Sequence, residues 1–239
     1  MRRALRLLIS AGPTREPIDP VRFISNYSTG YMGAQLAAEA LARGHRVKVI
    51  SGPISEPLPD RAAVVPVETA EEMGQALRQA AGWADAIVMA AAVSDFRPRV
   101  RAVGKLRRRH GLALRLEATP DIIGRLPRRP RQVIAGFALE TDQVVAHAMR
   151  KLREKRLHLL LAQQMPKSRP AARQRPGAAR GAPFGRCSVQ AWLLAGDGTI
   201  MPLGRRSKRD IAGLLLDKIE ALWYGQHNAN RRSLHAATR

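Results

Sequence analysis

The sequence has 239 residues, of which 45% are hydrophobic, and its formal net charge is +22. This length and apolar content suffice for one substantial domain with its own core. The sequence holds no run of about 18 apolar residues, so it predicts no membrane-spanning helix. Its single cysteine, Cys187, excludes an internal disulfide and fits a reducing cytoplasm.

The positive charge would concentrate anions such as nucleotides, phosphorylated metabolites or nucleic acid. Aromatic residues make up only 4% of the chain, so stacking surfaces of the kind found in RNA-binding proteins are scarce. A general bias toward arginine would give the same charge. Nucleic acid is therefore not the expected partner, although the charge does not exclude it.

Strands and helices are expected to alternate through the first 91 residues. The expected elements are strands over 5–10, 47–50, 64–67 and 86–91, helices over 30–43 and 69–81, and a long loop over 11–29. The strands are apolar on both faces, which is typical of a parallel sheet covered on each side. The sequence thus predicts an α/β fold: a Rossmann-like parallel sheet with helices on both faces.

The second half begins with an arginine-rich segment, 97–117, whose alternating Leu112, Leu114 and Leu116 predict a protruding β arm. This arm is a candidate flap and dimer element. The elements expected after it are a short helix over 121–126, strands over 133–137 and 157–162, and a helix over 143–155.

The C-terminal part is expected to contain a hairpin, because strands 189–194 and 199–203 flank Gly196-Asp197-Gly198. Ser207 is expected to cap a last helix. Residues 165–186 predict a mobile loop and residues 225–239 a disordered tail. One domain over 1–224 is therefore predicted.

The loop after the first strand is the first candidate site, because ligands of open α/β sheets bind beyond the carboxyl ends of strands. The G-x-G-x-x-G spacing is absent. Ser28-Thr29-Gly30 opens a helix, where amide groups and the helix dipole favour an anion by about 0.3–1 kcal/mol. An ordinary Ser/Thr N-cap explains the same residues, and Arg22 could merely pair with Asp19.

These residues also carry a family resemblance. The string from Ala11 to Gly33 resembles the A-G-x-T-R-E-x-x-D-P-V-R-x-I-S-N-x-S-S-G-x-M-G signature of phosphopantothenoylcysteine synthetases. The resemblance continues over 5–222. Its other parts are Ala90 to Phe96, Lys105 to Arg108, Thr119 to Ile122, Gly136 to Thr141, Lys151, Lys155 and Ser207-Lys208.

The resemblance implies a ligase of coenzyme A synthesis that acts in two steps. CTP, with Mg²⁺, activates the carboxylate of 4'-phosphopantothenate to an acyl-cytidylate and pyrophosphate. The amine of L-cysteine then attacks the acyl carbon and releases CMP. The family is usually homodimeric. The flavin-dependent decarboxylase domain often fused ahead of it is not in the sequence, so we expect ligation alone, without flavin.

The resemblance also implies roles for individual residues. Asn26 and Lys105 are expected to be catalytic, with Lys105 on a flap that supports the cysteine step. Arg22, Asn26 and Ala92 are expected to bind the acyl substrate. The residues expected to bind nucleotide are Gly12, Ser28, Thr29, Gly30, Met89, Ala90, Ala91, Asp95, Lys105, Pro120, Asp121, Ile122, Ile123, Phe137, Lys151 and Lys155. No metal ligand is assigned.

Ordinary structural roles remain open for several of these residues. Asp95 could form an Asx-turn, and Phe137 could pack in the core. Lys151 and Lys155 lie one helical turn apart, where like charges repel by about 0.2–0.5 kcal/mol. A triphosphate would relieve that repulsion, but so would solvent.

The sequence departs from the family pattern in three places. Tyr31 stands where lysine is common, Gln163-Gln164 replaces an Asn-Asp pair, and the 184–187 segment replaces an F-G-S-D-like run. The alternative function is a degenerate, non-catalytic relative that binds nucleotides or nucleic acid. The joint presence of Asn26, Asp95 and Lys105 favours catalysis.

Overall fold

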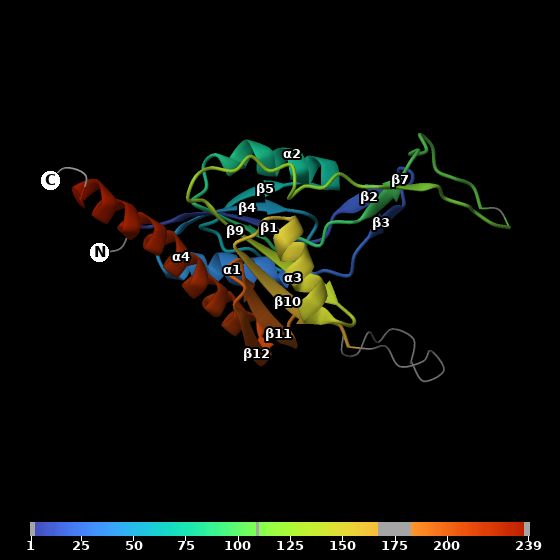
Figure 1. The fold of residues 1–239 in the computed structure, drawn as a ribbon. Helices are drawn as coiled ribbons and strands as arrows, with labels where there is room; N and C mark the ends of the chain where they lie inside the picture. The colour runs from blue at the N-terminus through green and yellow to red at the C-terminus, as the bar shows by residue number, and fades with distance from the viewer. Residues whose placement is uncertain (1–2, 109, 167–182, 237–239) are drawn as a thin grey trace. The chain divides into compact units, whose positions relative to one another are not determined.

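The computed structural model describes residues 3–108, 110–166 and 183–236 (Figure 1). The chain divides into two compact units, Met1–Gln132 and Val133–Arg239, where the sequence predicted one domain over 1–224. Within the described residues, no helix is both long enough and apolar enough to cross a bilayer.

The first unit is built on four parallel strands in the order β6-β1-β4-β5. Their bounds are β1 Arg6–Ala11, β4 Arg46–Ser51, β5 Ala63–Pro66 and β6 Ala86–Met89. In the central strand β1, Leu7 lies opposite both Val47 of β4 and Ala86 of β6. Residues 7–9 are completely buried, which confirms the predicted strand with two apolar faces.

Helices α1 (Tyr31–Ala42) and α2 (Ala70–Ala81) cover opposite faces of this sheet (Figure 1). At the start of α2, the hydroxyl of Thr69 accepts from the Glu72 amide at 3.2 Å, as the predicted N-cap requires. The Glu72 carboxylate turns back to the amide of Glu68, at 2.8 Å. Helices on both faces of a parallel sheet confirm the predicted Rossmann-like class in this unit.

The segment predicted as a long loop over 11–29 contains a hairpin, so that prediction was wrong in part. Strands β2 (Arg15–Pro17) and β3 (Phe23–Ser25) pair antiparallel. Each strand has only three residues, which is too short to leave a periodic pattern in the sequence.

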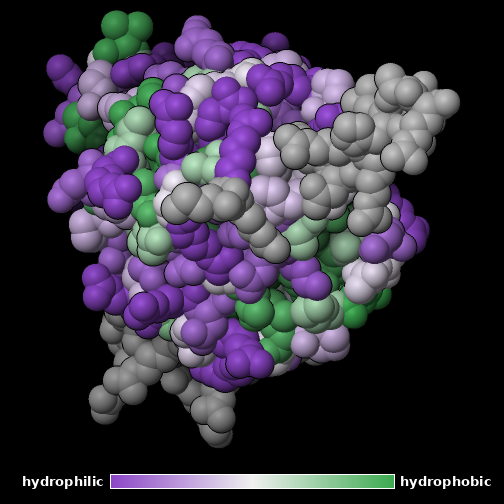
Figure 2. Space-filling view, turned by 90° about the vertical axis from the view of Figure 1, so that its left-hand side faces the viewer, coloured by the Kyte–Doolittle hydropathy of each residue, from purple (hydrophilic) through white to green (hydrophobic). Residues whose placement is uncertain are grey.

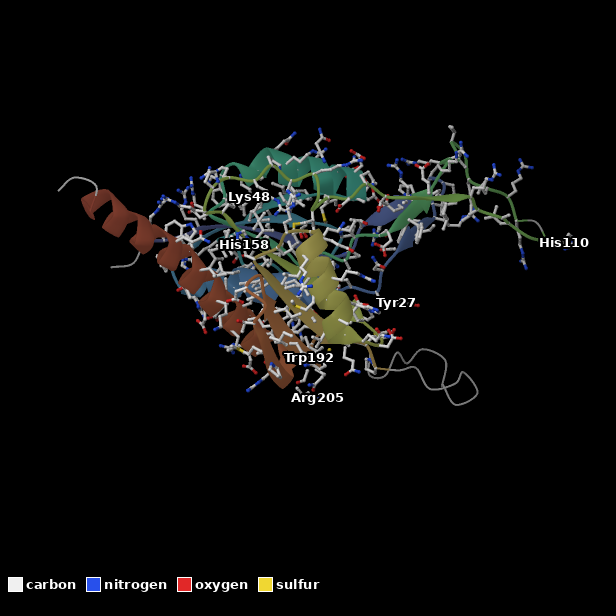
Figure 3. All side chains as sticks on the ribbon, viewed as in Figure 1. Tyr27, Lys48, His110, His158, Trp192 and Arg205 are labelled. Carbon is white, nitrogen blue, oxygen red and sulfur yellow. The ribbon has the colours of Figure 1, made fainter. Side chains whose placement is uncertain are left out.

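The predicted arm is present and begins at an antiparallel pair, β7 (Phe96–Pro98) and β8 (Leu116–Ala118). The chain between these strands extends away from them, with His110 near its far end (Figure 3). The alternating leucines 112 and 114 lie outside the strand and are exposed. The alternation therefore predicted the arm but not the length of its strands.

The short helix predicted over 121–126 is absent, and the segment forms turns instead. The Asp121 carboxylate accepts from the Gly124 amide at 3.1 Å, and the Arg125 amide donates to the Ile122 carbonyl at 3.3 Å. Gly124 and Pro127 disfavour a continued helix here.

The second unit contains a four-stranded sheet in the order β9-β10-β11-β12. The parallel strands are β9 (Val133–Glu140) and β10 (Leu159–Gln164), and the antiparallel hairpin is β11 (Ser188–Ala195) and β12 (Ile200–Ser207). Gly198 has φ 92° in the turn between β11 and β12. The predicted C-terminal hairpin is thereby confirmed.

Two helices complete this unit, α3 (Val144–Glu154) and α4 (Lys208–Ala236). The Ser207 hydroxyl accepts from the Asp210 amide at 3.1 Å, as predicted for a cap. Helix α4 continues to Ala236, within the segment from residue 225 for which a disordered tail is predicted. Most of the predicted mobile loop, 167–182, and residues 237–239 lie outside the described residues.

Candidate functional site

Two loops at the carboxyl ends of β1 and β6 are joined through their backbones. The Ala92 amide donates to the Gly12 carbonyl at 2.8 Å, and the Thr14 amide donates to the Ala92 carbonyl at 3.3 Å. The hydroxyl of Ser10 accepts from the Ala91 amide at 3.2 Å. The structure thus brings together the predicted residues Gly12, Ala91 and Ala92.

Asn26 lies against this junction. Its amide nitrogen donates to the Ala92 carbonyl at 2.8 Å, and the side chain is otherwise exposed. Two of the residues expected to bind the acyl substrate are therefore in direct contact.

Helix α1 begins after Gly30, whose φ of 83° is in the left-handed region. The Ser28 hydroxyl accepts from the Gly30 amide at 3.4 Å, and the Thr29 hydroxyl accepts from the Tyr31 amide at 3.3 Å. Both hydroxyls thus contact amides at the helix start, as an ordinary cap would. Binding of an anion here stays a prediction.

A packing role also explains the two glycines of this region. A Cβ on Gly12 would lie 2.4 Å from Cγ2 of Ile54, and a Cβ on Gly30 would lie 2.3 Å from the same atom. Ile54 follows β4, so its methyl group fixes how closely the loops after β1 and β4 approach each other. The glycines keep these loops tight whether or not a phosphate binds.

A buried polar network supports the loop after β6. The Thr14 hydroxyl accepts from the Ser94 amide at 3.0 Å, and the Thr119 hydroxyl donates to the Ser94 carbonyl at 2.6 Å. Thr119 also donates its amide to the Asp95 carbonyl at 2.9 Å. These bonds fix the backbone of Asp95 and leave its carboxylate exposed.

The predicted nucleotide-binding residues Met89 and Ile122 have side chains only 6% exposed. Ile122 packs beside Gly74 of α2, where a Cβ on that glycine would lie 3.4 Å from Cγ1 of Ile122. Both side chains belong to the core of the first unit. Any contact of these two residues with a nucleotide would come from their backbones, whereas Pro120 and Ile123 are half-buried.

Arg22 and Asp19 form the ion pair that the sequence left open, with 2.6 Å between Nη2 of Arg22 and Oδ2 of Asp19. The same guanidinium nitrogen donates to the Leu106 carbonyl at 2.6 Å. Arg22 is therefore engaged with the arm, next to Lys105. Lys105 itself is exposed.

The Asp19 carboxylate is buried and ionised. Burial alone would raise its pKa, but the amides of Val21, Leu106 and Arg22, together with the Arg22 guanidinium, lower the pKa to about 2. Sequence reasoning considered Asp19 only as a partner of Arg22. The bond between Asp19 and Leu106 spans 87 residues, and no local pattern signals it.

The remaining predicted nucleotide-binding residues belong to the second unit. The Lys151 ammonium group donates to the Phe137 carbonyl at 2.9 Å, which ties α3 to β9. Lys155 follows one turn later, and Phe137 is half-buried. His147, one turn before Lys151, has Nδ1 3.3 Å from a carboxylate oxygen of Glu140. Sequence reasoning did not identify this His147–Glu140 contact.

No cluster of three or more His, Cys, Asp or Glu side chains suited to a metal occurs in the part of the chain that the structure describes. Mg²⁺ in nucleotide sites is held largely by phosphate oxygens and water, with one or two carboxylates. Asp95 is an exposed carboxylate of the kind that such sites use.

Comparison with known proteins gives one family over nearly the whole chain. The model of the DNA/pantothenate metabolism flavoprotein C-terminal domain matches residues 3–222. The chain is 36% identical over 219 residues to the coenzyme A biosynthesis bifunctional protein CoaBC of Bacillus subtilis, covering 90% of this chain and 51% of that protein. It is 35% identical over 221 residues to a cysteine/cysteine sulfinic acid decarboxylase of an unknown prokaryotic organism, covering 91% and 58%.

Solved structures agree with this match. The C-terminal domain of a CoaBC protein superposes with a TM-score of 0.73 at 32% identity, covering 94% of this chain and all of that one. A Cab2 variant in complex with phosphopantothenate-cysteine has a TM-score of 0.68 at 18% identity, covering 95% and 89%, and it shares the fold. The chain spans about half the length of the curated relatives it matches.

Proposed function

The chain belongs to the family of DNA/pantothenate metabolism flavoprotein C-terminal domains, and on this premise we propose that it is a phosphopantothenate–cysteine ligase. CTP with Mg²⁺ activates the carboxylate of 4'-phosphopantothenate, giving an acyl-cytidylate and pyrophosphate. The amine of L-cysteine attacks the acyl carbon, the bond to CMP breaks, and 4'-phosphopantothenoylcysteine forms. The protein works as a homodimer in the cytoplasm.

The observation that carries this proposal is the contact of Asn26 with Ala92, at the junction of the loops after β1 and β6. It supports an acyl group lying beside an uncharged amide. Such an amide can donate to an oxygen on which negative charge develops, without adding charge of its own. Two loops fixed by backbone bonds hold that donor before the substrate arrives.

Phosphate binding is proposed at the start of α1. The amides of the first helical turn and the dipole favour an anion. Ser28, Thr29 and Gly30 supply this end of the helix. Lys151 and Lys155 are proposed to contact phosphates, Phe137 the base, and Asp95 the nucleotide.

The relative named as a decarboxylase suggests a different reaction. The chain spans 58% of that relative, so the chemistry that gives it its name need not reside in the shared part. Ligation requires no flavin, and none is proposed.

The proposal is tested by incubating the protein with 4'-phosphopantothenate, L-cysteine and Mg²⁺ and supplying CTP, ATP, GTP or UTP in turn. Pyrophosphate release that depends on phosphopantothenate, with CTP preferred, is the expected result. Mass spectrometry should detect 4'-phosphopantothenoylcysteine only when cysteine is present. Absence of the condensed product with all four nucleotides would refute the ligase.

A further inference from the structure

The arm is attached at Leu106 to the loop between β2 and β3 through a buried carboxylate, that of Asp19. The side chain of Asp19 is completely buried, although Pro20, Val21 and Arg22 beside it are exposed. Each of its two oxygens accepts hydrogen bonds from two donors. Oδ1 accepts the amides of Val21 and Arg22, both at 2.8 Å. Oδ2 accepts the Leu106 amide at 3.1 Å and the Arg22 guanidinium at 2.6 Å.

Both backbone polar groups of Leu106 are hydrogen-bonded. Its amide donates to Asp19, and its carbonyl accepts from Arg22 at 2.6 Å. A further backbone bond, from the Ala102 amide to the Ile18 carbonyl at 2.9 Å, lies four residues earlier in the arm. These bonds flank Lys105, whose own side chain is exposed.

Most of the arm between β7 and β8 has no regular structure, so little else fixes where Lys105 lies. A flexible lysine of this kind loses much rotamer and backbone freedom when it must reach a reacting group. The buried Asp19 carboxylate reduces that cost, because it already holds the backbone of the neighbouring Leu106. Hydrogen bonds to charged groups are also stronger than those between neutral groups.

We propose that Asp19 is a positioning residue that holds the arm at Leu106 and thereby fixes the location of Lys105 for the cysteine step. This inference rests on the proposed ligase function, because Lys105 is assigned to that step there. Asp19 touches neither substrate nor nucleotide in this account. Its effect reaches Lys105 through Leu106, which is held by Asp19 itself and by the Arg22 guanidinium that Asp19 binds.

Asp19→Asn is the sharpest test, because it keeps the size of the side chain and changes its hydrogen bonding. A carboxylate has two acceptor oxygens, whereas an amide has one acceptor and one donor group. Whichever way the asparagine is turned, its NH₂ group faces two donors. The matched control is Asp197→Asn, since the Asp197 carboxylate accepts from the Thr199 amide at 2.8 Å in the turn between β11 and β12, outside the arm.

The first readout needs no substrate. Hydrogen exchange at residues 102–106 should be roughly 10- to 100-fold faster in Asp19→Asn than in the wild type, as expected for loss of hydrogen bonds to a charged group. Trypsin should cleave faster after Lys105 and Arg107. Unchanged exchange and cleavage, in a variant with wild-type circular dichroism, would overturn the inference.

The second readout separates the two half-reactions. Asp19→Asn should slow transfer to cysteine by about 100-fold, the size of effect that a small misplacement of a reacting group produces. Pyrophosphate release before cysteine is added should stay within a few-fold of the wild-type rate. Equal loss in both steps would point to general unfolding of the first loop and contradict the proposal.

A double-mutant cycle with Lys105→Gln tests whether Asp19 acts through that lysine. Adding Asp19→Asn to Lys105→Gln should change the cysteine step by less than about twofold, because the two substitutions remove one function. Full additivity would overturn the proposed route through Lys105. A wild-type protein without ligase activity would refute the proposed function and this catalytic role with it, while exchange at 102–106 would still report whether Asp19 holds the arm.

Discussion

Asn26 is an exposed side chain whose amide nitrogen lies 2.8 Å from the carbonyl oxygen of Ala92. Asn26→Asp would place a carboxylate oxygen against that carbonyl and beside an anionic intermediate. We expect formation of the acyl-cytidylate to slow by about 100- to 1000-fold, as when a donor to developing charge is removed. Pyrophosphate release measures this step.

Asn26→Ala serves as the comparison, since it removes the donor without adding charge. It should lose less activity than Asn26→Asp. Wild-type pyrophosphate release in Asn26→Asp would refute the role given to this amide.

Lys105 is exposed on the arm, one residue before the Leu106 peptide that Asp19 and Arg22 hold. Lys105→Gln keeps the length of the side chain nearly unchanged and removes its charge. We expect transfer to cysteine to fall more than activation by CTP, because the flap is assigned to the second step. Rapid-quench measurement of pyrophosphate and CMP resolves the two steps, and equal losses would argue against a dedicated flap lysine.

At the scale of elements, the start of β1 is joined to the residue before β6 by an ion pair in which Asp85 is buried and Arg6 is half-buried. Asp85 accepts from the Arg6 amide at 3.0 Å and from the Arg6 guanidinium at 2.9 and 3.2 Å. Burial would raise the pKa of Asp85, but the bonds and charge of Arg6 lower it below its usual value, and the same pair raises the pKa of Arg6. Asp85 therefore stabilises the fold in its ionised form.

The sign of the pH effect follows from that lowered pKa. Stability from Asp85 is fully present above the pKa of the unfolded state, about 3.9, and is lost as the pH falls through the lower folded pKa. Asp85→Ala should reduce the free energy of unfolding at pH 7 by about 1–3 kcal/mol, because buried donors lose their acceptor. The difference from the wild type, measured by urea unfolding, should shrink below about pH 4. A difference that is constant with pH would contradict this.

Comparing three glycines distinguishes the two reasons why Gly30, at the start of α1, would not tolerate a side chain: its left-handed backbone and the lack of space for a Cβ. Gly30 has φ 83° and no space for a Cβ beside Ile54, Gly44 has φ 80° with open space, and Gly82 is right-handed with open space. Substitution by alanine should lower the free energy of unfolding by about 1–2 kcal/mol at Gly44, from the left-handed conformation alone. The loss should be larger at Gly30 and small at Gly82. Thermal unfolding of the three variants measures the order. Adding Ile54→Ala to Gly30→Ala should restore part of the lost stability, because it removes the clashing methyl group. No recovery would show that the clash is absent.

The elements that sequence reasoning predicted correctly are those with a long apolar period. The strands over 5–10 and 86–91 were recognisable because they bury both faces. The β2–β3 pair was not, and the alternation that predicted the arm did not give the bounds of β7 and β8, because three-residue strands carry no period and are held by partners distant in sequence. For the same reason Asp19 was recognised beside Arg22 but not as the acceptor of the Leu106 amide.

The residues of the candidate site were likewise predicted in part. Asn26 and Ala92 were each expected to bind the acyl substrate, and the structure places them in contact although they are 66 residues apart in sequence. The strand predicted over 86–91 indicated a core side chain for Met89, but the family signature did not indicate one for Ile122, because a signature records which residues recur without distinguishing side-chain from backbone roles. Ile54, which packs against two signature glycines, lies outside the quoted motifs altogether.

At the scale of the whole molecule, the charge of +22 is the feature that favours a nucleic-acid binder over a ligase. Hydrophilic residues cover most of the face drawn in Figure 2. Binding of nucleic acid through many phosphate contacts should weaken by about 10³- to 10⁵-fold between 50 and 200 mM salt. Binding of CTP at a fixed site should weaken far less.

We expect the protein to retain CTP at 200 mM salt and to release single-stranded RNA and duplex DNA. Isothermal titration at several salt concentrations with each ligand measures this. Specific nucleic-acid binding that persists at 200 mM salt, together with no CTP binding, would favour the degenerate relative.

The pairing of β1 has a consequence for how the chain is made. Leu7 pairs with Val47 on one side and with Ala86 on the other. During translation this strand, apolar on both faces, lacks its second neighbour until β6, some 80 residues later, has left the ribosome. Contacts so distant in sequence slow folding and leave the nascent segment open to aggregation. A chaperone that protects nascent chains should therefore bind at β1 before β6 has been made.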